Sequence, residues 1–396
     1  MLLQVICAIL IFPAFLACCY YWFLALYSLK KRRPLPPAKM NIMRSFAIVI
    51  PAHNEEKAIV TILNSCKKLS YPNDKYKVYV IVDNCSDHTA EIAKNNGAEC
   101  MIRNDETYQG KGYALAWAFD QILQKQFDAV VVLDADCLID AQALEIFNQY
   151  LENEYHVLQA TILPSNPDSS VISYVLSVGN IIEKDLFYSP KSQLGMTVFL
   201  QGTGMVFHRS ILEQYEWRAH SIAEDVEYTI HLLRNNIPIQ FINETYILSE
   251  FPCQLRQLNI QRMRWARGNF NASKKHALNL MLEGCKKKQW ILFDAGWTLF
   301  ILSRPLIASV LFIANMVAIL CIIVSPDTFS LAILTICFVS LLSYCFYFLF
   351  GIAHFGITIH RMKFLLYAPV VVLKLIVISL LSLQHKGNEH WIRTPR

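Results

Sequence analysis

Charged residues are scarce at both ends of this chain. Of its 67 Asp, Glu, Lys and Arg side chains, residues 1–29 carry none and residues 291–385 carry only six. Over all 396 residues, 54% are hydrophobic and 17% are charged, which is too apolar for a soluble chain of this size. We therefore exclude a wholly soluble protein and a disordered chain.

The middle of the chain has no such deficit. Residues 30–290 hold 57 of the 67 charges, which is the composition of an ordinary soluble domain that can bury its own core. A carrier built almost entirely of membrane-spanning helices is therefore excluded as well. A globular domain tethered to a membrane remains.

Further absences narrow the class of protein. The net charge is only +5, and the basic clusters at residues 30–33 and 286–288 lie where apolar and polar segments meet. They indicate membrane flanks, and we expect no nucleic-acid partner. The twelve cysteines include no C-x-x-C pair and no zinc-ligand spacing, which indicates free thiols in a reducing compartment. We find no internal repeat and no low-complexity tract.

The first apolar segment predicts a membrane anchor. Residues 2–29 are long enough to cross about 30 Å of hydrocarbon and are followed at once by four basic residues. A cleaved signal peptide would carry its positive charge first. We therefore expect a retained anchor over residues 1–29 with its N-terminus outside. A stiff basic and proline-rich linker over residues 30–44 would then lead into a cytosolic domain.

Two uncharged segments near the other end predict a membrane hairpin, at residues 305–324 and 329–350. Residues 364–383 are equally apolar, but they contain Lys374 and Pro369. A span there would put the basic tail of residues 386–396 outside, against the positive-inside tendency, so we predict an interfacial or re-entrant segment. The membrane region of residues 290–385 thus holds two or three spans. We expect its first part, residues 290–302, to lie along the membrane surface.

The polar middle, residues 45–289, alternates short apolar runs with helical stretches. Three runs rich in β-branched residues, at residues 46–50, 78–82 and 129–133, are typical of strands covered on both faces. Helical stretches separate and follow them, at residues 55–69, 89–96, 113–124, 141–151, 171–186 and 255–282. We therefore predict an α/β domain with a parallel sheet.

Polar side chains follow all three predicted strands. They are the segments His53 to Glu56, Asp83 with Asn84, and Asp134 to Asp136. In an α/β sheet, ligands bind at the carboxyl ends of the strands. A lone Asp after a strand is more often a turn or helix cap, but three polar segments at one edge favour a nucleotide or metal site.

Asp134 and Asp136 form the sharpest local motif. Residues i and i+2 on an extended chain project to the same side, so these two carboxylates can share a hard cation, Mg²⁺ or Mn²⁺. A D-x-D pattern alone is common, and its place directly after an apolar strand strengthens the interpretation. Such a metal would neutralise a diphosphate leaving group.

Gln261, Arg264 and Trp265 share one face of a predicted helix, because they stand at positions i, i+3 and i+4. The guanidinium offers a fork for phosphate oxygens and the indole offers a flat apolar surface for a sugar. An amphipathic helix that packs its tryptophan into the core and turns its arginines to anionic lipid explains this pattern equally well.

In their order along the chain, these motifs resemble those of the membrane-embedded family 2 glycosyltransferases of the GT-A fold. The motifs are I-V-I-P-A-H-N-E-E at residues 48–56, V-D-N-C-S-D at 82–87, D-x-D at 134–136, E-D at 224–225 and Q-x-x-R-W at 261–265. The family includes cellulose, hyaluronan and poly-N-acetylglucosamine synthases. The resemblance covers about residues 46–265 and implies a Rossmann-like cytosolic domain, at residues 45–289, between membrane helices. The terminal W-I-R-T-P-R sequence resembles the tails of bacterial exopolysaccharide members.

The resemblance also implies a role for each candidate residue. The nucleotide of a UDP-sugar donor would be bound by Ala52, Glu55, Asp83, Lys111 and Asp134. Mg²⁺ or Mn²⁺ would bind Asp134 and Asp136. The acceptor and the diphosphate would contact Gln201, Gly202, Thr203, Glu224, Gln261, Arg264 and Trp265.

Asp225 would be the catalytic base by the same resemblance, although acids in a first helical turn often only complement the helix dipole. It would take the proton of the acceptor hydroxyl as that oxygen attacks the anomeric carbon opposite UDP. One in-line displacement inverts the anomeric centre, so an α-linked donor would give a β-linkage.

Two features depart from the family pattern. Ala52 stands where several synthases have a hydroxyl residue, which points to a different nucleotide pocket. The membrane part is smaller than that of cellulose synthase, which counts against a polysaccharide channel enclosed by this chain alone.

We therefore expect a multi-pass cell-membrane protein that transfers sugar from a UDP-sugar to a growing extracellular polysaccharide or other glycan. One alternative is the transfer of a single sugar to a membrane lipid such as a polyprenyl phosphate, diacylglycerol or sphingolipid. Another is a non-catalytic scaffold of a polysaccharide-export complex. Membrane lipids, self-association and an export partner are the further contacts that this hypothesis implies.

Overall fold

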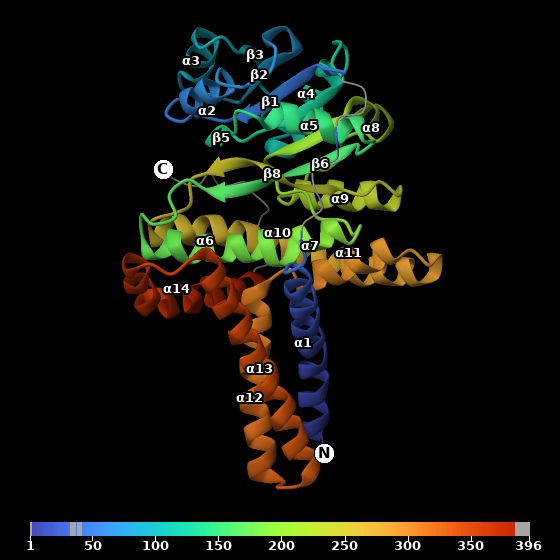
Figure 1. The fold of residues 1–396 in the computed structure, drawn as a ribbon, viewed down its shortest axis with the longest axis vertical. Coiled ribbons are helices and arrows are strands. Elements are labelled where there is room, and N and C mark those ends of the chain that lie inside the picture. Colours follow the sequence, from blue (N-terminus) through green and yellow to red (C-terminus); the bar gives the residue numbers. More distant parts are fainter. Residues whose placement is uncertain (1, 32–36, 38–41, 385–396) are drawn as a thin grey trace.

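The computed structural model describes residues 2–31, 37 and 42–384. Figure 1 shows three layers: an α/β domain, a set of helices lying crosswise beneath it, and a helical bundle that projects away from both. The predicted tail of residues 386–396 and most of the predicted linker at residues 30–44 lie outside the described residues.

An eight-stranded sheet forms the α/β domain, in the order β3-β2-β1-β4-β7-β6-β8-β5. Its strands are β1 (Phe46–Ala52), β2 (Tyr76–Asp83), β3 (Glu99–Arg103), β4 (Ala129–Val132), β5 (Cys137–Ile139), β6 (Val157–Pro164), β7 (Met205–His208) and β8 (Gln240–Ser249). The three predicted strands are confirmed as β1, β2 and β4. β1 lies between the other two and is parallel to both.

The prediction of a parallel sheet holds for β1 to β4 and is wrong for the whole sheet. β7 runs antiparallel to its neighbours β4 and β6, and β5 runs antiparallel to β8. β5 and β7 could not be predicted from the sequence because they are short, with three residues in β5 and four in β7. β8 is longer, but its sequence interleaves polar with apolar residues and half of it faces outward.

The strands divide their side chains between two cores. Along β1, Ala47 and Val49 face the core that is shared with the crosswise helices, whereas Phe46, Ile48 and Ile50 face the core covered by the outer helices. This alternation is the period of two expected for a strand. Because both faces are covered, β1 reads as one continuous apolar run.

The helices of the first half confirm the predicted α/β alternation. They are α2 (Ile59–Cys66), η1 (Asn73–Lys75), α3 (Thr89–Asn95), α4 (Lys111–Ile122) and α5 (Ala143–Glu152). α2 starts later than the predicted residue 55. Asn54 has a left-handed φ of 57°, and the Glu55 N–H donates to Thr89 Oγ1 at 2.8 Å, so this segment is a loop tied to the start of α3.

A second set of helices lies between the sheet and the bundle. It comprises α6 (Val171–Glu183), the π-helical turn η2 (Lys184–Tyr188), α7 (Ser189–Gln193), α9 (Glu224–Arg234), α10 (Leu255–Lys287) and α11 (Trp290–Ile301). The short helix α8 (Arg209–Gln214) instead contacts β7 at the edge of the α/β domain. α6, α10 and α11 lie crosswise to the bundle in Figure 1. The predicted helical stretches at residues 171–186 and 255–282 correspond to α6 with η2 and to α10.

Three helices form the projecting bundle, namely α1 (Leu2–Tyr27), α12 (Arg304–Val324) and α13 (Thr328–Phe355). Each is long and apolar enough to cross a membrane. Polar contacts also join them: Gln4 Nε2 donates to Ser330 Oγ at 2.9 Å, and Asn315 Nδ2 donates to the Cys337 carbonyl at 3.0 Å. Such bonds satisfy polar groups that would otherwise face hydrocarbon.

α14 (Ile359–Gln384) is the fourth helix long and apolar enough to span a membrane among the described residues. It lies crosswise to the bundle and packs against α6, α10 and α12 (Figure 1). Its Leu366 and Leu373 are 79% and 61% exposed, which suits a helix lying in the membrane interface. The interfacial or re-entrant character of residues 364–383 stays a prediction.

Candidate active site

One cavity of about 2890 Å³ lies between the sheet and the crosswise helices, and every residue that we predicted for the site lines it. These residues are Ala52, Glu55, Asp83, Lys111, Asp134, Asp136, Gln201, Gly202, Thr203, Glu224, Asp225, Gln261, Arg264 and Trp265. They come from three strand ends, two loops and three helices. The structure thus brings together residues that are up to 213 positions apart in the sequence, from Ala52 to Trp265.

Asp83 ends β2 and is only 6% exposed. Arg103 at the end of the neighbouring strand β3 donates from Nη1 to Asp83 Oδ1 at 2.6 Å, and from Nη2 to Asp105 Oδ2 at 2.9 Å. Burial raises the pKa of Asp83 while Arg103 opposes that shift. Arg103 therefore holds the Asp83 carboxylate in one orientation at the wall of the cavity.

Asp134 and Asp136 follow β4 as predicted, and ligand atoms of Asp134, Asp136 and Cys137 all lie within 4.8 Å of one another. The two carboxylates suit a hard divalent cation. The Cys137 thiol is buried, and that burial raises its pKa well above the usual value, with the nearby Asp136 and Asp134 acting in the same direction. The residues present therefore fit a hard divalent cation, Mg²⁺ or Mn²⁺, which Asp134 and Asp136 would hold.

Lys111 begins α4 and reaches across the cavity. Its Nζ donates to Asp134 Oδ1 at 2.5 Å and to the Gly202 carbonyl at 2.9 Å. Burial by itself lowers the pKa of Lys111, but the charges of Asp134, Glu224 and Asp225 outweigh it, so the pKa lies above its usual value. The ammonium is therefore held charged among these three acidic residues.

The loop of residues 201–204 is held by Gln159, a fully buried residue of β6. Gln159 accepts from the Gln201 N–H at 2.9 Å and donates to the Thr203 carbonyl at 2.9 Å. Gly202 has a φ of +78°, in the left-handed region that favours glycine. This loop brings backbone close to Lys111 and Asp225, because a methyl group on Gly202 would lie 3.3 Å from Lys111 Nζ and 3.6 Å from Asp225 Oδ2.

Glu224 and Asp225 are the first two residues of α9 and face the cavity. Burial raises the pKa of both carboxyls, and the positive charge of Lys111 opposes the shift in each. The Asp225 Oδ1 accepts from the Val226 N–H at 2.8 Å, which fixes its rotamer. A buried carboxylate of raised pKa, aimed into a cavity, is a candidate general base.

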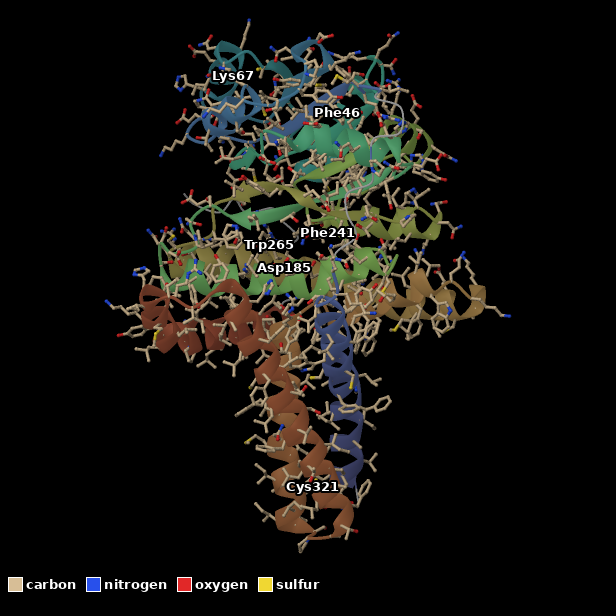
Figure 2. All side chains as sticks on the ribbon, in the orientation of Figure 1. Phe46, Lys67, Asp185, Phe241, Trp265 and Cys321 are labelled. Atoms are coloured by element: carbon tan, nitrogen blue, oxygen red, sulfur yellow. The ribbon has the colours of Figure 1, made fainter. Side chains whose placement is uncertain are left out.

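α10 supplies the opposite wall through Gln261, Arg264 and Trp265, which confirms that these residues share a face. Burial lowers the pKa of Arg264, whereas the charges of Glu224, Asp134 and Asp136 oppose that shift, so its guanidinium faces the acidic end. Trp265 is 43% exposed and therefore is not packed into the core. Figure 2 shows it in the layer between the sheet and the bundle.

The cavity continues beyond the predicted site towards the bundle. Its further lining comes from α6, α12, α13 and α14, and includes Glu183, Arg304, Phe312, Tyr344, Leu349 and Val372. Sequence reasoning missed this part, together with Arg103, because none of these residues belongs to a short motif. The one sequence feature that pointed to this part of the cavity was Arg262, which lies inside the Q-x-x-R-W motif and also lines the cavity.

Residues 44–268, more than half of the chain, match the family described as Glycosyltransferase like family 2. The chain belongs to this family and is a glycosyltransferase. The Rossmann-like sheet and its flanking helices are those of the GT-A fold, so the predicted family and fold are confirmed. A mannosyltransferase from Pyrobaculum calidifontis, solved in complex with GDP-Man and Mn²⁺, has the same fold over 96% of this chain and 99% of its own. Its TM-score is 0.59 and its sequence identity is 17%.

Curated relatives resemble this chain at lower coverage. A probable glycosyltransferase from Bacillus subtilis, YdaM, is 25% identical over 60% of this chain and 58% of its own length. A beta-monoglucosyldiacylglycerol synthase from Trichormus variabilis is 26% identical over 57% of this chain and 48% of its own. A poly-beta-1,6-N-acetyl-D-glucosamine synthase from Staphylococcus aureus is 26% identical over 61% and 58%. This chain therefore aligns with about half to three fifths of each relative.

Proposed function

We propose that this protein transfers a sugar from a nucleotide-diphosphate sugar to an acceptor hydroxyl, with a divalent metal on the diphosphate and inversion at the anomeric carbon. The observation that carries the proposal is the convergence of Asp134, Asp136 and Asp225 around Lys111 in one cavity. Paired carboxylates for a cation stand on one side, and a separate buried carboxylate stands on the other. This division supplies the two functions that such a transfer requires.

The donor end is formed by the strand ends. Asp83, oriented by Arg103, accepts hydrogen bonds from the nucleoside. Asp134 and Asp136 would hold the metal, which would supply positive charge that stabilises the diphosphate as a leaving group. Lys111 and Arg264 donate to the phosphate oxygens, because both face this acidic end of the cavity. UDP is the nucleotide that the motifs imply, and GDP is the alternative that the Pyrobaculum structure raises.

The acceptor oxygen forms its new bond to the anomeric carbon as the bond from that carbon to the diphosphate breaks. Asp225 takes the hydroxyl proton, and the nucleoside diphosphate leaves with the bonding electrons. The loop of residues 201–204 and Trp265 position the acceptor beside Asp225. Attack from the side opposite the leaving group inverts the anomeric centre.

We propose a membrane lipid as the acceptor, in place of the growing polysaccharide that headed our sequence hypothesis. The cavity that holds Asp225 continues among apolar side chains of α12, α13 and α14, which suits an acyl or isoprenoid chain. Extension of a glycan remains the second candidate, favoured by the Q-x-x-R-W face. The domain lies on the cytosolic side in this proposal, where nucleotide sugars are available.

A donor panel tests the proposal on the full chain in detergent. Purified protein is incubated with Mn²⁺, a membrane lipid extract and each of several UDP-sugars and GDP-mannose, and nucleoside diphosphate release is measured. We expect release with one donor, loss of release in excess EDTA, and loss in Asp136→Asn. The matched control is Asp120→Asn, an exposed acid on α4 outside the cavity. Undiminished release in EDTA would exclude the metal, and no release with any donor would favour the scaffold alternative.

A further inference from the structure

Two neighbouring arginines of α10 face opposite ends of the cavity. Arg262 and Arg264 are two residues apart, so their side chains diverge by about 200° around the helix. Arg264 faces Glu224, Asp134 and Asp136 at the donor end, whereas the carboxylate that acts on Arg262 is Glu183. Arg262 therefore does not serve the donor phosphates.

A second arginine stands at the same place. Arg304 Nη1 lies 3.5 Å from Glu183 Oε2, so Glu183 is the shared neighbour of both guanidinium groups. Arg262 lies over the ring of Trp265 at 4.8 Å, and Arg304 lies over the ring of Phe187 at 5.7 Å. One carboxylate beside two guanidinium groups leaves an excess of positive charge at this point of the cavity.

Both arginines are incompletely satisfied. The Nε atoms of Arg262 and Arg304 are buried and have no hydrogen-bond partner among the residues that the structure describes. Arg44 and Arg267 also have a buried nitrogen without such a partner, but neither lines the cavity. Burial lowers the pKa of Arg262 to about 10, as expected for a guanidinium removed from water without full compensation. A buried, under-bonded arginine pair beside a cavity is the arrangement that binds a phosphate.

The walls beside this pair are apolar. The cavity lining from the bundle and from α14 includes Phe312, Leu341, Phe348, Leu349, Val372 and Leu373. Phe312, Leu349 and Leu373 are also 58%, 56% and 61% exposed, so the cavity opens to the surface between helices that are long enough to span a membrane. A ligand bound here has an anionic group at the arginines and an apolar chain between these helices.

We propose that Arg262 and Arg304 bind the phosphate of an anionic lipid, whose chain lies among α12, α13 and α14 and whose headgroup extends towards Asp225. This inference rests on the proposed function, because it takes the anionic lipid to be the acceptor of the sugar. A free phosphate shares the chemistry of the headgroup. The apolar lining, which a free phosphate would leave uncovered, favours the lipid.

Direct binding to the full chain tests the site without depending on catalysis. The probes are phytanyl phosphate, its neutral counterpart phytanol, inorganic phosphate, and UDP with Mn²⁺. Wild-type protein should bind phytanyl phosphate at least about tenfold more tightly than phytanol. Arg262→Gln and Arg304→Gln should each weaken phytanyl phosphate by about tenfold or more, and leave the affinities for phytanol and UDP unchanged.

Two control variants distinguish binding at this site from binding at the donor site and from nonspecific attraction of an anion to exposed positive charge. A third, conservative variant tests folding. Arg264→Gln should weaken UDP with Mn²⁺ and leave phytanyl phosphate binding unchanged. Lys363→Gln removes an exposed positive charge of α14 outside the cavity and should change neither affinity. Arg304→Lys keeps the charge and should retain part of the phytanyl phosphate affinity, which distinguishes lost binding from lost folding.

Three results would overturn the inference. They are equal affinities for phytanyl phosphate and phytanol, inorganic phosphate binding as tightly as phytanyl phosphate, and a loss in Lys363→Gln as large as that in Arg262→Gln. Failure of the proposed function has a different signature. In that case no nucleotide sugar would be turned over and neither UDP nor GDP would bind with Mn²⁺, while the arginine dependence of phytanyl phosphate binding would persist.

Discussion

Asp225 and Glu224 are adjacent acids that begin a helix inside a cavity, which is costly for two carboxylates. The helix start offers N–H groups and a favourable dipole, and Lys111 offers a positive charge. Burial nevertheless outweighs these effects, since the pKa of both acids is raised. A carboxyl group whose pKa is raised by burial is typical of residues that transfer protons in active sites.

The substitution Asp225→Asn tests whether Asp225 is the catalytic base. The amide keeps the shape of the side chain but cannot take a proton, so turnover should fall by roughly 10²-fold or more while affinity for UDP with Mn²⁺ stays within about twofold. Thermal stability should be unchanged or higher, because a neutral amide does not pay for burying a charge. Single-turnover kinetics, nucleotide titration and a melting curve measure the three quantities. Near-normal turnover would show that another residue is the base.

The same acid predicts the pH dependence. A base must be deprotonated to act, and burial raises the pKa of Asp225, so kcat/KM should rise with pH across the weakly acidic range. On the acid side of that pKa, it should lose about tenfold per pH unit. Lys111 lowers the pKa of Asp225, so Lys111→Met should move the acid limb to higher pH. A movement to lower pH, or a flat profile in wild type, contradicts the assignment.

At the scale of elements, we expect the proposed sugar transfer to depend on the conformation of the loop of residues 201–204. Gln159 fixes it from β6, and Gly202 gives it the left-handed turn that brings its carbonyl to Lys111. Lys111 is thereby held between the loop and Asp134. The loop therefore connects Lys111 and Asp134, which we propose to act on the donor, with Asp225, which we propose as the base.

Gly202→Ala tests this coupling. The added methyl group would lie 3.3 Å from Lys111 Nζ in a backbone conformation that alanine adopts at a cost of about 1–2 kcal/mol. We expect turnover to fall by about tenfold or more, since misplacing a catalytic group by about 1 Å costs roughly 10²-fold. Gly195→Ala is the matched control, because Gly195 has a φ of +75° and open space around it. Equal activity of both variants would mean that the loop does not position Lys111.

Elements also show what could be read from the sequence. β1, β2 and β4 were predicted because each contains a continuous apolar run that is buried on both faces, whereas β5 and β7 are short and β8 interleaves polar with apolar residues. The donor and base residues were predicted because strand ends and a family motif mark them. Glu183 and Arg304 were not, because they come together only where α6, α10 and α12 meet in space.

In the whole molecule, the anchor and the domain form one unit. The Tyr21 hydroxyl of α1 donates to the Ile301 carbonyl at 2.8 Å, and Trp22 Nε1 donates to the Ser343 carbonyl at 3.0 Å. Lys191 of α7, fully buried, lies 2.8 Å from Asp294 of α11. α1 thus packs with α12 and α13 instead of tethering the domain loosely.

The orientation of this unit is the remaining prediction at this scale. The basic cluster of residues 286–288 follows the α/β domain, so that flank should be cytosolic, and the turn between α12 and α13 should lie outside. Two single-cysteine chains report on the two flanks: one keeps only Cys285, an exposed native cysteine beside the basic cluster, and the other carries only Ser325→Cys in the turn. A membrane-impermeant thiol reagent applied to intact cells should label Ser325→Cys and leave Cys285 unlabelled until the cells are permeabilised. Labelling of Cys285 in intact cells would place the cavity outside, away from nucleotide sugars, and would remove the basis for the proposed donor as well as for the topology.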